Sequence, residues 1–365
     1  MKNTIGSALT LTLFGESHGP YIGAVVDGLA PGVPVDENDI RHALDMRRPS
    51  GKISTKRVEK DEFSVVSGVY NGKTTGTPLT VIIKNENTQS RDYEYGPARP
   101  GHADYTAHVK YHGYEDFRGG GHFSGRVTAA IVASCAVVRA ALEKKGILVG
   151  THISSLCSIR DRGFINYEED IKYLYGRQFP TLMEEAEAQM RSAAERCADL
   201  GDSIGGVLET AVIGVPAGVG EPFFGTVEGE ISKAVFSVPA VKGVSFGLGY
   251  DFANVFGCEA NDEIRYDENG QVVFTKNNNG GVNGGITNGA PILFKTVIKP
   301  TPSVFKPQNT IDFIKGENIV HTVKGRHDPM IIHRARAVVD ALTAFTVADL
   351  LTVRYGDDYL SGEQT

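Results

Sequence analysis

The sequence predicts a layered α/β or α+β sandwich, and three observations favour it. Apolar, strand-like runs bounded by Gly or Pro alternate along the chain with segments of helical periodicity. One helical segment, from about Ser124 to Lys145, is apolar on nearly every side, which is typical of a helix buried inside a protein. No Pro/Ser-rich linker or charge block interrupts the 365 residues, so we expect a single large domain over residues 1–365.

Capping residues and apolar spacing place the helices. Asp36 can cap a helix that ends at about Arg48 and turns Ile40 and Leu44 inward. The apolar helix is expected to stop at Gly146. Three more helices are expected at residues 182–200, 227–237 and 334–352, followed by a tail that we expect to be flexible from about residue 354.

Strands are expected between these helices, at residues 24–26, 79–84, 207–213 and 291–298. Two stretches share one order of elements, because VVDGLAPGVPVDENDIRHAL and AVIGVPAGVGEPFFGTVEGEISKAV both predict a strand, a Pro/Gly turn and then a helix. This internal pseudo-repeat predicts a duplicated unit.

Composition limits the partners of the protein. The formal net charge of −7 argues against general binding to nucleic acid, so an anionic ligand must meet local basic clusters. No segment approaches the ~20 consecutive apolar residues of a membrane span, and the first apolar run is too short for a signal peptide. Four separated cysteines without a CxxC pair are expected to be reduced, buried thiols of a cytoplasmic protein.

The first of four polar stretches that could form a site is GESHGP, which follows the strand-like LTLTLF and places His18 at a strand end. Histidine titrates near neutral pH and can supply a proton to a leaving phosphate. A turn histidine bonded locally to Ser17 or Glu16 is the alternative, and spacing alone does not separate the two.

The second stretch is RRPSGK, where Arg47 and Arg48 follow the helix that Asp36 caps. Guanidinium groups bind carboxylate and phosphate with paired hydrogen bonds, so this cluster suits a substrate with several anionic groups. A solvated basic helix end that complements the helix dipole is the alternative, and it is favoured on this stretch alone.

The third stretch, RPGHADYTAHVKYHGYEDFRGGGHFSGRVTAA, leads a triple glycine into the buried helix. Glycine backbone at a helix N-terminus exposes unpaired N–H groups to an anion, and Arg126 adds charge there. A tight turn that packs the helix is the alternative. The four histidines of this stretch do not match the spacing of a zinc site, so we expect no metal.

The fourth stretch, KGRHDP, precedes the last long helix and holds Asp328, which could accept a proton if the site keeps it rigid. An N-terminal helix cap is the alternative, and it is preferred for an isolated Asp-Pro. Just upstream, GGVNGGITNG and KPTPS offer polar backbone and Lys299, a lining that suits a planar phosphorylated cofactor.

Taken in order, FGESHGP, RRPSGK, TTGTPL, RPGHADY, RGGGHFSGRVTA, PAVKGVSFG, GGVNGGITNG and GRHDP resemble the chorismate synthase family from about residue 4 to about residue 352. The resemblance implies a β-α-β sandwich, assembled as a homotetramer with one flavin per subunit. It also implies an anti-1,4 elimination of phosphate from 5-enolpyruvylshikimate 3-phosphate to give chorismate. This lyase reaction needs reduced flavin mononucleotide (FMN) and has no net redox change.

The resemblance also implies the roles of single residues. His18 would serve the departing phosphate, His102 would keep the reduced flavin in its proper protonation state, and Asp328 would receive a proton through the flavin N5. The substrate anions are expected to meet Arg47, Arg48, Arg118, Arg126 and Arg334. The flavin contacts carry over to His122, Phe123, Ser124, Glu259, Ala260, Gly284, Lys299, Pro300, Thr301, Pro302, Ser303 and Arg326.

One departure affects the flavin pocket. Many bacterial members have Arg-Ser where this chain has His122-Phe123, so the contacts made there are expected to differ in kind. The chain has no large added segment, so we expect NADPH to act only as an indirect reductant, through a separate flavin reductase.

Overall fold

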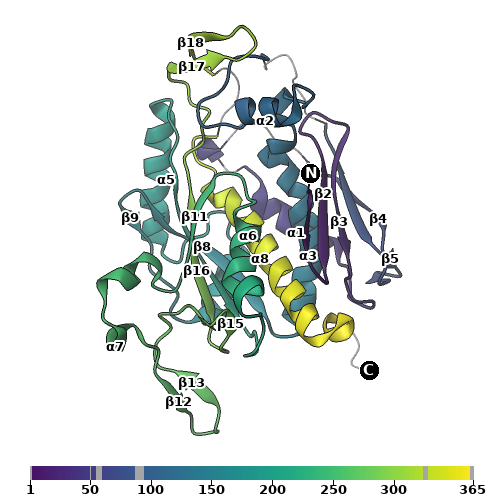
Figure 1. The fold of residues 1–365 in the computed structure, drawn as a ribbon, viewed down its shortest axis with the longest axis vertical. Coiled ribbons are helices and arrows are strands. Elements are labelled where there is room, and N and C mark those ends of the chain that lie inside the picture. Colours follow the sequence, from purple (N-terminus) through teal and green to yellow (C-terminus); the bar gives the residue numbers. More distant parts are fainter. Residues whose placement is uncertain (1, 50, 55–59, 87–93, 324–327, 362–365) are drawn as a thin grey trace.

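Two five-stranded antiparallel sheets enclose a layer of helices (Figure 1). The structure is a computed structural model that describes residues 2–49, 51–54, 60–86, 94–323 and 328–361. The expected α+β class and β-α-β sandwich are therefore confirmed.

The first sheet has the order β1-β2-β3-β7-β4. Its strand β7 alternates buried residues with half-buried or exposed ones, and Leu79, Val81 and Ile83 turn inward onto the helices. The strands span Thr4–Gly6 (β1), Thr10–Gly15 (β2), Tyr21–Asp27 (β3), Phe63–Ser67 (β4) and Leu79–Lys84 (β7).

The second sheet has the order β11-β16-β10-β8-β9. Its inner face buries Leu208 and Phe294 against the helices. The strands span Leu148–Leu156 (β8), Ile159–Arg160 (β9), Gly206–Ile213 (β10), Val241–Phe246 (β11) and Ile292–Ile298 (β16).

Four helices fill the space between the sheets: Glu37–Arg47 (α1), Thr128–Lys144 (α3), Val227–Val235 (α6) and Ile332–Tyr355 (α8). The Asp36 side chain accepts a hydrogen bond from the amide of Asn38 at 2.8 Å, so the predicted N-cap of α1 is confirmed. The stretch Gly125–Lys144 is long and apolar enough to span a membrane, but 83% of its most apolar 18-residue window is buried inside the protein, so α3 is a core helix.

The internal repeat is present in the topology. Each half runs strand, strand, helix, strand, strand, long helix: β2-β3-α1-β4-β7-α3 and β8-β10-α6-β11-β16-α8. The sheet orders β2-β3-β7-β4 and β8-β10-β16-β11 correspond strand for strand, and every pair is antiparallel. The two halves are thus copies of one unit.

Further elements decorate this sandwich. Helix α4 (Tyr167–Tyr175) packs on β8, and α5 (Glu184–Asp199) contacts β9 of the second sheet. Helix α2 (Asp104–Tyr111) lies near the hairpin of β17 (Gln308–Asp312) and β18 (Glu317–His321) (Figure 1). A projecting arm, residues 249–274, holds α7 (Gly257–Ala260), β12 (Ile264–Tyr266) and β13 (Val272–Phe274). Short strands complete the set: Val69–Tyr70 (β5), Lys73–Thr74 (β6), Val282–Asn283 (β14) and Ile286–Thr287 (β15).

Two expectations need correction. Cys135 is buried as predicted, but Cys157 and Cys258 are exposed because they lie in a turn and on the projecting arm, and Cys197 is half-buried. The described residues after 354 do not form a flexible tail: α8 continues to Tyr355, and a 3-10 turn then buries Leu360.

Candidate active site

A cavity of about 1090 Å³ opens at one end of the sandwich, where the first turns of α3 and α8 approach the last turn of α1. Its walls come from both halves of the chain. Val127 just before α3, Ile131 of α3 and Val338 of α8 form an apolar side, while arginine, histidine and glycine residues form a polar side. This volume is sufficient for a cofactor-sized ligand.

The triple glycine forms a loop pressed against His18. Gly119, Gly120 and Gly121 all have positive φ angles, of 62°, 82° and 54°, which side chains with a Cβ rarely adopt. A Cβ atom at residue 119 would lie 2.3 Å from two atoms of the His18 ring. The amide of Ser17 donates to the Gly121 carbonyl at 3.0 Å. The loop therefore fixes His18, which is only 9% exposed, at the cavity wall.

Arg126 is buried at the start of α3 and is held from the first sheet. Its Nε donates to the side-chain oxygen of Asn85 at 3.0 Å, and its Nη1 pairs with Asp61. The Asn85 amide in turn donates to the carbonyls of Glu16 and Gly19, at 3.0 and 2.8 Å. Asn85 therefore couples the histidine turn to the arginine.

Arg47 ends α1 and is also buried. Its Nε donates to the Thr128 hydroxyl at 3.0 Å, and its Nη1 lies 4.0 Å from an Asp61 oxygen. Burial, together with the nearby charge of Arg334, lowers the pKa of Arg47 to about 9. Arg47 therefore stays cationic at neutral pH.

Asp328 faces the same cluster from the second half. Arg334 donates from Nη1 to Asp328 at 2.8 Å and from Nε to the Arg47 carbonyl at 3.1 Å. The helix begins at Ile332 and has Ile331 at its N-cap, so Asp328 is not the helix cap. The Thr301 hydroxyl donates to the backbone carbonyl of Asp328 at 2.6 Å, which ties the backbone of this residue to the KPTPS segment.

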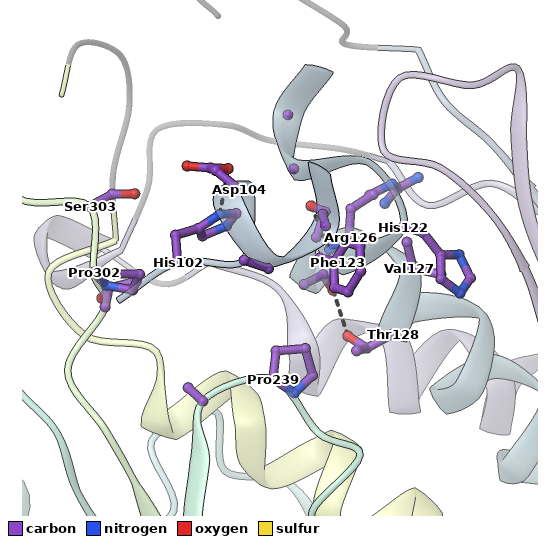
Figure 2. Close-up of a pocket in the computed structure, with 18 of the residues that line it drawn as sticks. His102, Asp104, His122, Phe123, Arg126, Val127, Thr128, Pro239, Pro302 and Ser303 are labelled. Atoms are coloured by element: carbon purple, nitrogen blue, oxygen red, sulfur yellow. Dashed lines mark hydrogen bonds and ion pairs between the residues drawn. The ribbon is translucent and has the colours of Figure 1, made fainter. Parts of the chain in front are cut away.

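His102 lies across the cavity from His122, beside Asp104 (Figure 2). Its Nδ1 is 2.7 Å from an oxygen of Asp104. Lys299, at the end of β16, donates from Nζ to the Gly101 carbonyl at 2.5 Å. Burial and the neighbouring Lys242 lower the pKa of Lys299. The second half of the chain thus fixes the turn that carries His102.

The structure brings most of the predicted site residues into this one cavity. Those that line it are His18, Arg47, His102, His122, Phe123, Ser124, Arg126, Lys299, Thr301, Pro302, Ser303, Asp328 and Arg334.

The other predicted residues lie elsewhere in the described part of the chain, apart from Arg326, which is outside the described residues. Arg48 turns to Asp45 and the Lys60 carbonyl, and Arg118 forms a fork with Asp116. Pro300 lies next to the lining residue Lys299, Glu259 and Ala260 lie on α7 of the projecting arm, and Gly284 lies in the β14–β15 turn.

Sequence reasoning missed the acidic and amide partners. Asp61 and Asp104 line the cavity, whereas Asn85 acts from behind it by holding Arg126. Asn85 directly follows a strand, and a polar residue at a strand end was the available signal. Asp104 opens α2, so from sequence it is indistinguishable from a residue that complements the helix dipole.

A metal centre is not formed by the residues that the structure describes, since they contain no group of three His, Cys, Asp or Glu placed to hold an ion. The fold and the cavity define an α+β sandwich protein with a cavity whose lining suits a small ligand with several negative charges. Within its arginine cluster, Arg47, Arg126 and Arg334 face the two carboxylates of Asp61 and Asp328, so positive charge is in excess in that cluster.

Comparison with known proteins identifies the family. The chorismate synthase family model matches residues 9–352. The chorismate synthase of Korarchaeum cryptofilum is 46% identical over 94% of this chain and 96% of its own length, and that of Lachnoclostridium phytofermentans is 43% identical over 96% and 95%. A crystal structure of chorismate synthase is 29% identical, with a TM-score of 0.76 over 96% of this chain and 94% of that chain. This chain belongs to the chorismate synthase family, which is a family of enzymes.

Proposed function

We propose that this protein converts 5-enolpyruvylshikimate 3-phosphate to chorismate and phosphate, with reduced FMN bound beside the substrate. One observation carries the proposal. His18, His102 and Asp328 come from sequence stretches more than 80 residues apart, and they line one cavity together with Arg47, Arg126 and Arg334. The membership of the family supports the same reaction.

The residues of the cavity fit a flavin nucleotide. Phe123 and the apolar side of the cavity suit a planar ring, and Lys299, with Ser124 and Ser303, suits a phosphate and hydroxyl groups. At Gly125 a Cβ would meet no heavy atom within 4 Å, so the backbone there is open to close approach by a ligand. When bound, reduced FMN supplies the electron density that assists the elimination without net redox change.

The chain's own residues then bind anions and move protons. Arg47, Arg126 and Arg334 are placed to hold the carboxylate and phosphate groups of the substrate. The C3–O bond breaks, and phosphate leaves with the bonding electron pair as the C6 hydrogen is lost. His18 donates a proton to the departing phosphate. Asp328, held by Arg334, takes up the proton that is lost.

An anaerobic assay tests this proposal. With reduced FMN, we expect phosphate and chorismate to appear in equal amounts, as measured by a phosphate assay and by chorismate absorbance. A second arm with oxidised FMN and NADPH should give no product until a flavin reductase is added. If the first arm gives neither product, the proposed function is wrong.

We also propose that the protein is a cytoplasmic homotetramer. Phe223 and Phe224, which are 86% and 98% exposed, precede α6, and Tyr250, Phe256 and Tyr266 are exposed on the projecting arm. Exposed aromatic groups of this size are typical of surfaces that bind another chain. All four cysteines are free thiols, which is compatible with the cytoplasm.

Sedimentation velocity tests the assembly. We expect the wild-type protein to sediment as a tetramer, and Phe224→Asp or Phe256→Asp to shift it to smaller species with unchanged far-UV circular dichroism. A wild-type monomer at micromolar concentration would contradict the proposal.

A further inference from the structure

The His102 ring is held by a carboxylate two residues further along the chain. Its Nδ1 lies 2.7 Å from Oδ1 of Asp104, and the two side chains lie side by side at the cavity wall (Figure 2). The Arg99 carbonyl accepts from the His102 amide at 3.0 Å, which closes the turn between these residues.

Arg99 keeps Asp104 ionised and in place. It donates from Nε to Oδ2 at 2.8 Å and from Nη2 to Oδ1 at 2.7 Å, and its backbone amide donates to Oδ2 at 3.0 Å. Burial alone would raise the pKa of Asp104, but the hydrogen bonds from Arg99 and His102 hold it well below its usual range. The first turn of α2, which Asp104 opens, also favours a negative charge.

The tautomer of His102 follows from the donors and acceptors around Nδ1. Nη2 of Arg99 also lies 3.0 Å from this nitrogen; a guanidinium can only donate, so this contact would need an unprotonated Nδ1, whereas the ionised Asp104 can only accept and needs a protonated Nδ1, at the shorter distance of 2.7 Å. The ionised Asp104 is the stronger partner, because charge-assisted hydrogen bonds are about twice as strong as neutral ones. Nδ1 therefore carries a proton and donates it to Asp104.

With Nδ1 occupied, the opposite nitrogen faces the glycine loop. A Cβ atom at residue 120 would lie 3.6 Å from Nε2 of His102, so this nitrogen lies directly over Gly120. The loop continues into His122, Phe123 and Ser124, the segment proposed to contact flavin. Nε2 is thus the atom that exchanges or shares a proton on the cavity side.

We propose that Asp104, clamped by Arg99, is a positioning residue that holds His102 as the Nδ1–H tautomer and presents Nε2 to the cavity. This inference rests on the proposed function, in which His102 controls the protonation of the bound cofactor. Asp104 and Arg99 both approach Nδ1, the imidazole nitrogen opposite Nε2, so they act on His102 through the ring.

Asp104→Asn tests the proposal, because an amide that faces Arg99 with its oxygen turns its NH₂ group toward Nδ1 and favours the opposite tautomer. The chain offers a matched control in Asp170. An Arg162 fork at 2.9 and 2.5 Å and the Ile165 amide at 3.0 Å hold its carboxylate, as Arg99 holds Asp104, but at a site remote from the cavity.

The first readout does not use activity. In protein labelled with ¹⁵N-histidine, the His102 resonances are identified by their loss in His102→Gln, and they report which ring nitrogen is protonated. We expect the Nδ1–H form in the wild type and in Asp170→Asn, and the Nε2–H form in Asp104→Asn. The same tautomer in Asp104→Asn as in the wild type overturns the proposal.

The second readout is turnover under anaerobic conditions. We expect Asp104→Asn to lower kcat about 100-fold, the lower end of a positioned acid–base contribution, with KM and FMN affinity within threefold of the wild type. Asp104→Glu, which keeps a carboxylate, should recover part of this loss and covers the case in which Asp104→Asn does not fold. Equal kcat in Asp104→Asn and Asp170→Asn overturns the inference, whereas a wild type without turnover contradicts the proposed function instead.

Discussion

In the first half of the molecule, residues 16–20 alone connect β2 to β3 and carry His18, whereas the same connection in the second half runs over residues 157–205 and contains α4 and α5. The connections into the long helices α3 and α8 differ in the residues that they carry. The first carries His102, the glycine loop and Arg126, and the second carries Lys299, the segment 301–303 and Asp328.

The repeated strands and helices form the scaffold of the protein, whereas the connections between them carry most of the candidate site. Four strands and two helices of each half correspond one for one, so these duplicated elements alone do not distinguish a catalytic half from a structural half. Most of the candidate site residues lie in the connections, which are free to differ because they pack less tightly than the elements they join; Arg47 at the end of α1 and Arg334 in α8 are the exceptions. The first half supplies most of the cationic and histidine groups of the cavity, and the second half supplies the carboxylate Asp328.

The largest loss of kcat is expected from Gly119→Ala, a substitution in the first half's connection from β7 to α3. The new Cβ would lie 2.3 Å from the His18 ring at a φ of 62°, so the ring must move. We expect kcat to fall about 1000-fold, within the range for loss of a positioned acid–base group. Gly146→Ala is the control, since it has a φ of 74° but its Cβ would meet no heavy atom within 4 Å and it does not line the cavity, and equal losses in both variants would refute a specific role for Gly119.

The next prediction is a loss of unfolding free energy on substitution of His152 in β8 of the second sheet. His152 of β8 is fully buried between Asp161 and Glu209, at 2.9 and 3.0 Å. His152→Gln removes the cation between the two carboxylates, of which only Glu209 keeps another ion-pair partner among the described residues, Lys295 at 3.6 Å, so we expect a loss of about 3 kcal/mol of unfolding free energy at pH 6, measured by urea denaturation.

The pH dependence of that loss has a definite sign. Burial lowers the pKa of His152, but the hydrogen bonds to Asp161 and Glu209 outweigh it and raise the pKa above its usual value. The stabilisation is therefore complete below about pH 6.5, the ordinary value of histidine, and declines as the pH rises through the higher pKa of the folded state. A wild-type advantage that grows with pH would contradict this assignment.

A smaller effect is expected where the halves join. The Asp349 carboxylate of α8 accepts from the amides of Ser7, Ala8 and Leu9, at 2.9, 2.8 and 2.8 Å. Asp349→Ala leaves these amides without that acceptor, so we expect a loss of about 2 kcal/mol in stability, with kcat within twofold. The exposed Asp357→Ala should change neither, and an equal loss there would show that the Asp349 contacts are not the cause.

The smallest change in stability is expected at the turn after α6, in the second half of the chain. Ala240 has a φ of 75°, in a turn closed by the Val241 amide and the Val238 carbonyl at 3.2 Å. A left-handed conformation costs a residue with a Cβ about 1–2 kcal/mol, so Ala240→Gly should stabilise the protein by about 1 kcal/mol in thermal unfolding. Ala217→Gly, at a residue without a positive φ, should give no increase in stability, and an equal increase there would show that the φ of Ala240 is not the cause.

The sequence predicted those features that local patterns encode. The apolar character of α3 on all sides predicted a core helix, and Asp36 marked the start of α1. The strand β8 and the helix α4 were not predicted, and the order of the strands depends on pairings between residues far apart in the chain.

The candidate site was predicted in part for the same reason. Arginine and histidine beside glycine are visible in a local stretch, whereas Asp61 gains a role only when folding brings it to Arg126, which is 65 residues away. Asn85 likewise meets Arg126 and the histidine turn only in the folded protein. Arg48 shows the reverse, because it is adjacent to the buried Arg47 in sequence but turns away from the cavity.

The most direct test compares FMN binding with turnover in His18→Ala, His102→Ala and Asp328→Ala. If the cavity performs the proposed elimination, each variant binds FMN within about tenfold of the wild type and loses about 100-fold or more in kcat, as expected for residues that transfer protons. Wild-type kcat in all three variants, with phosphate and chorismate still formed in equal amounts, would show that the reaction takes place without these residues and would contradict the account.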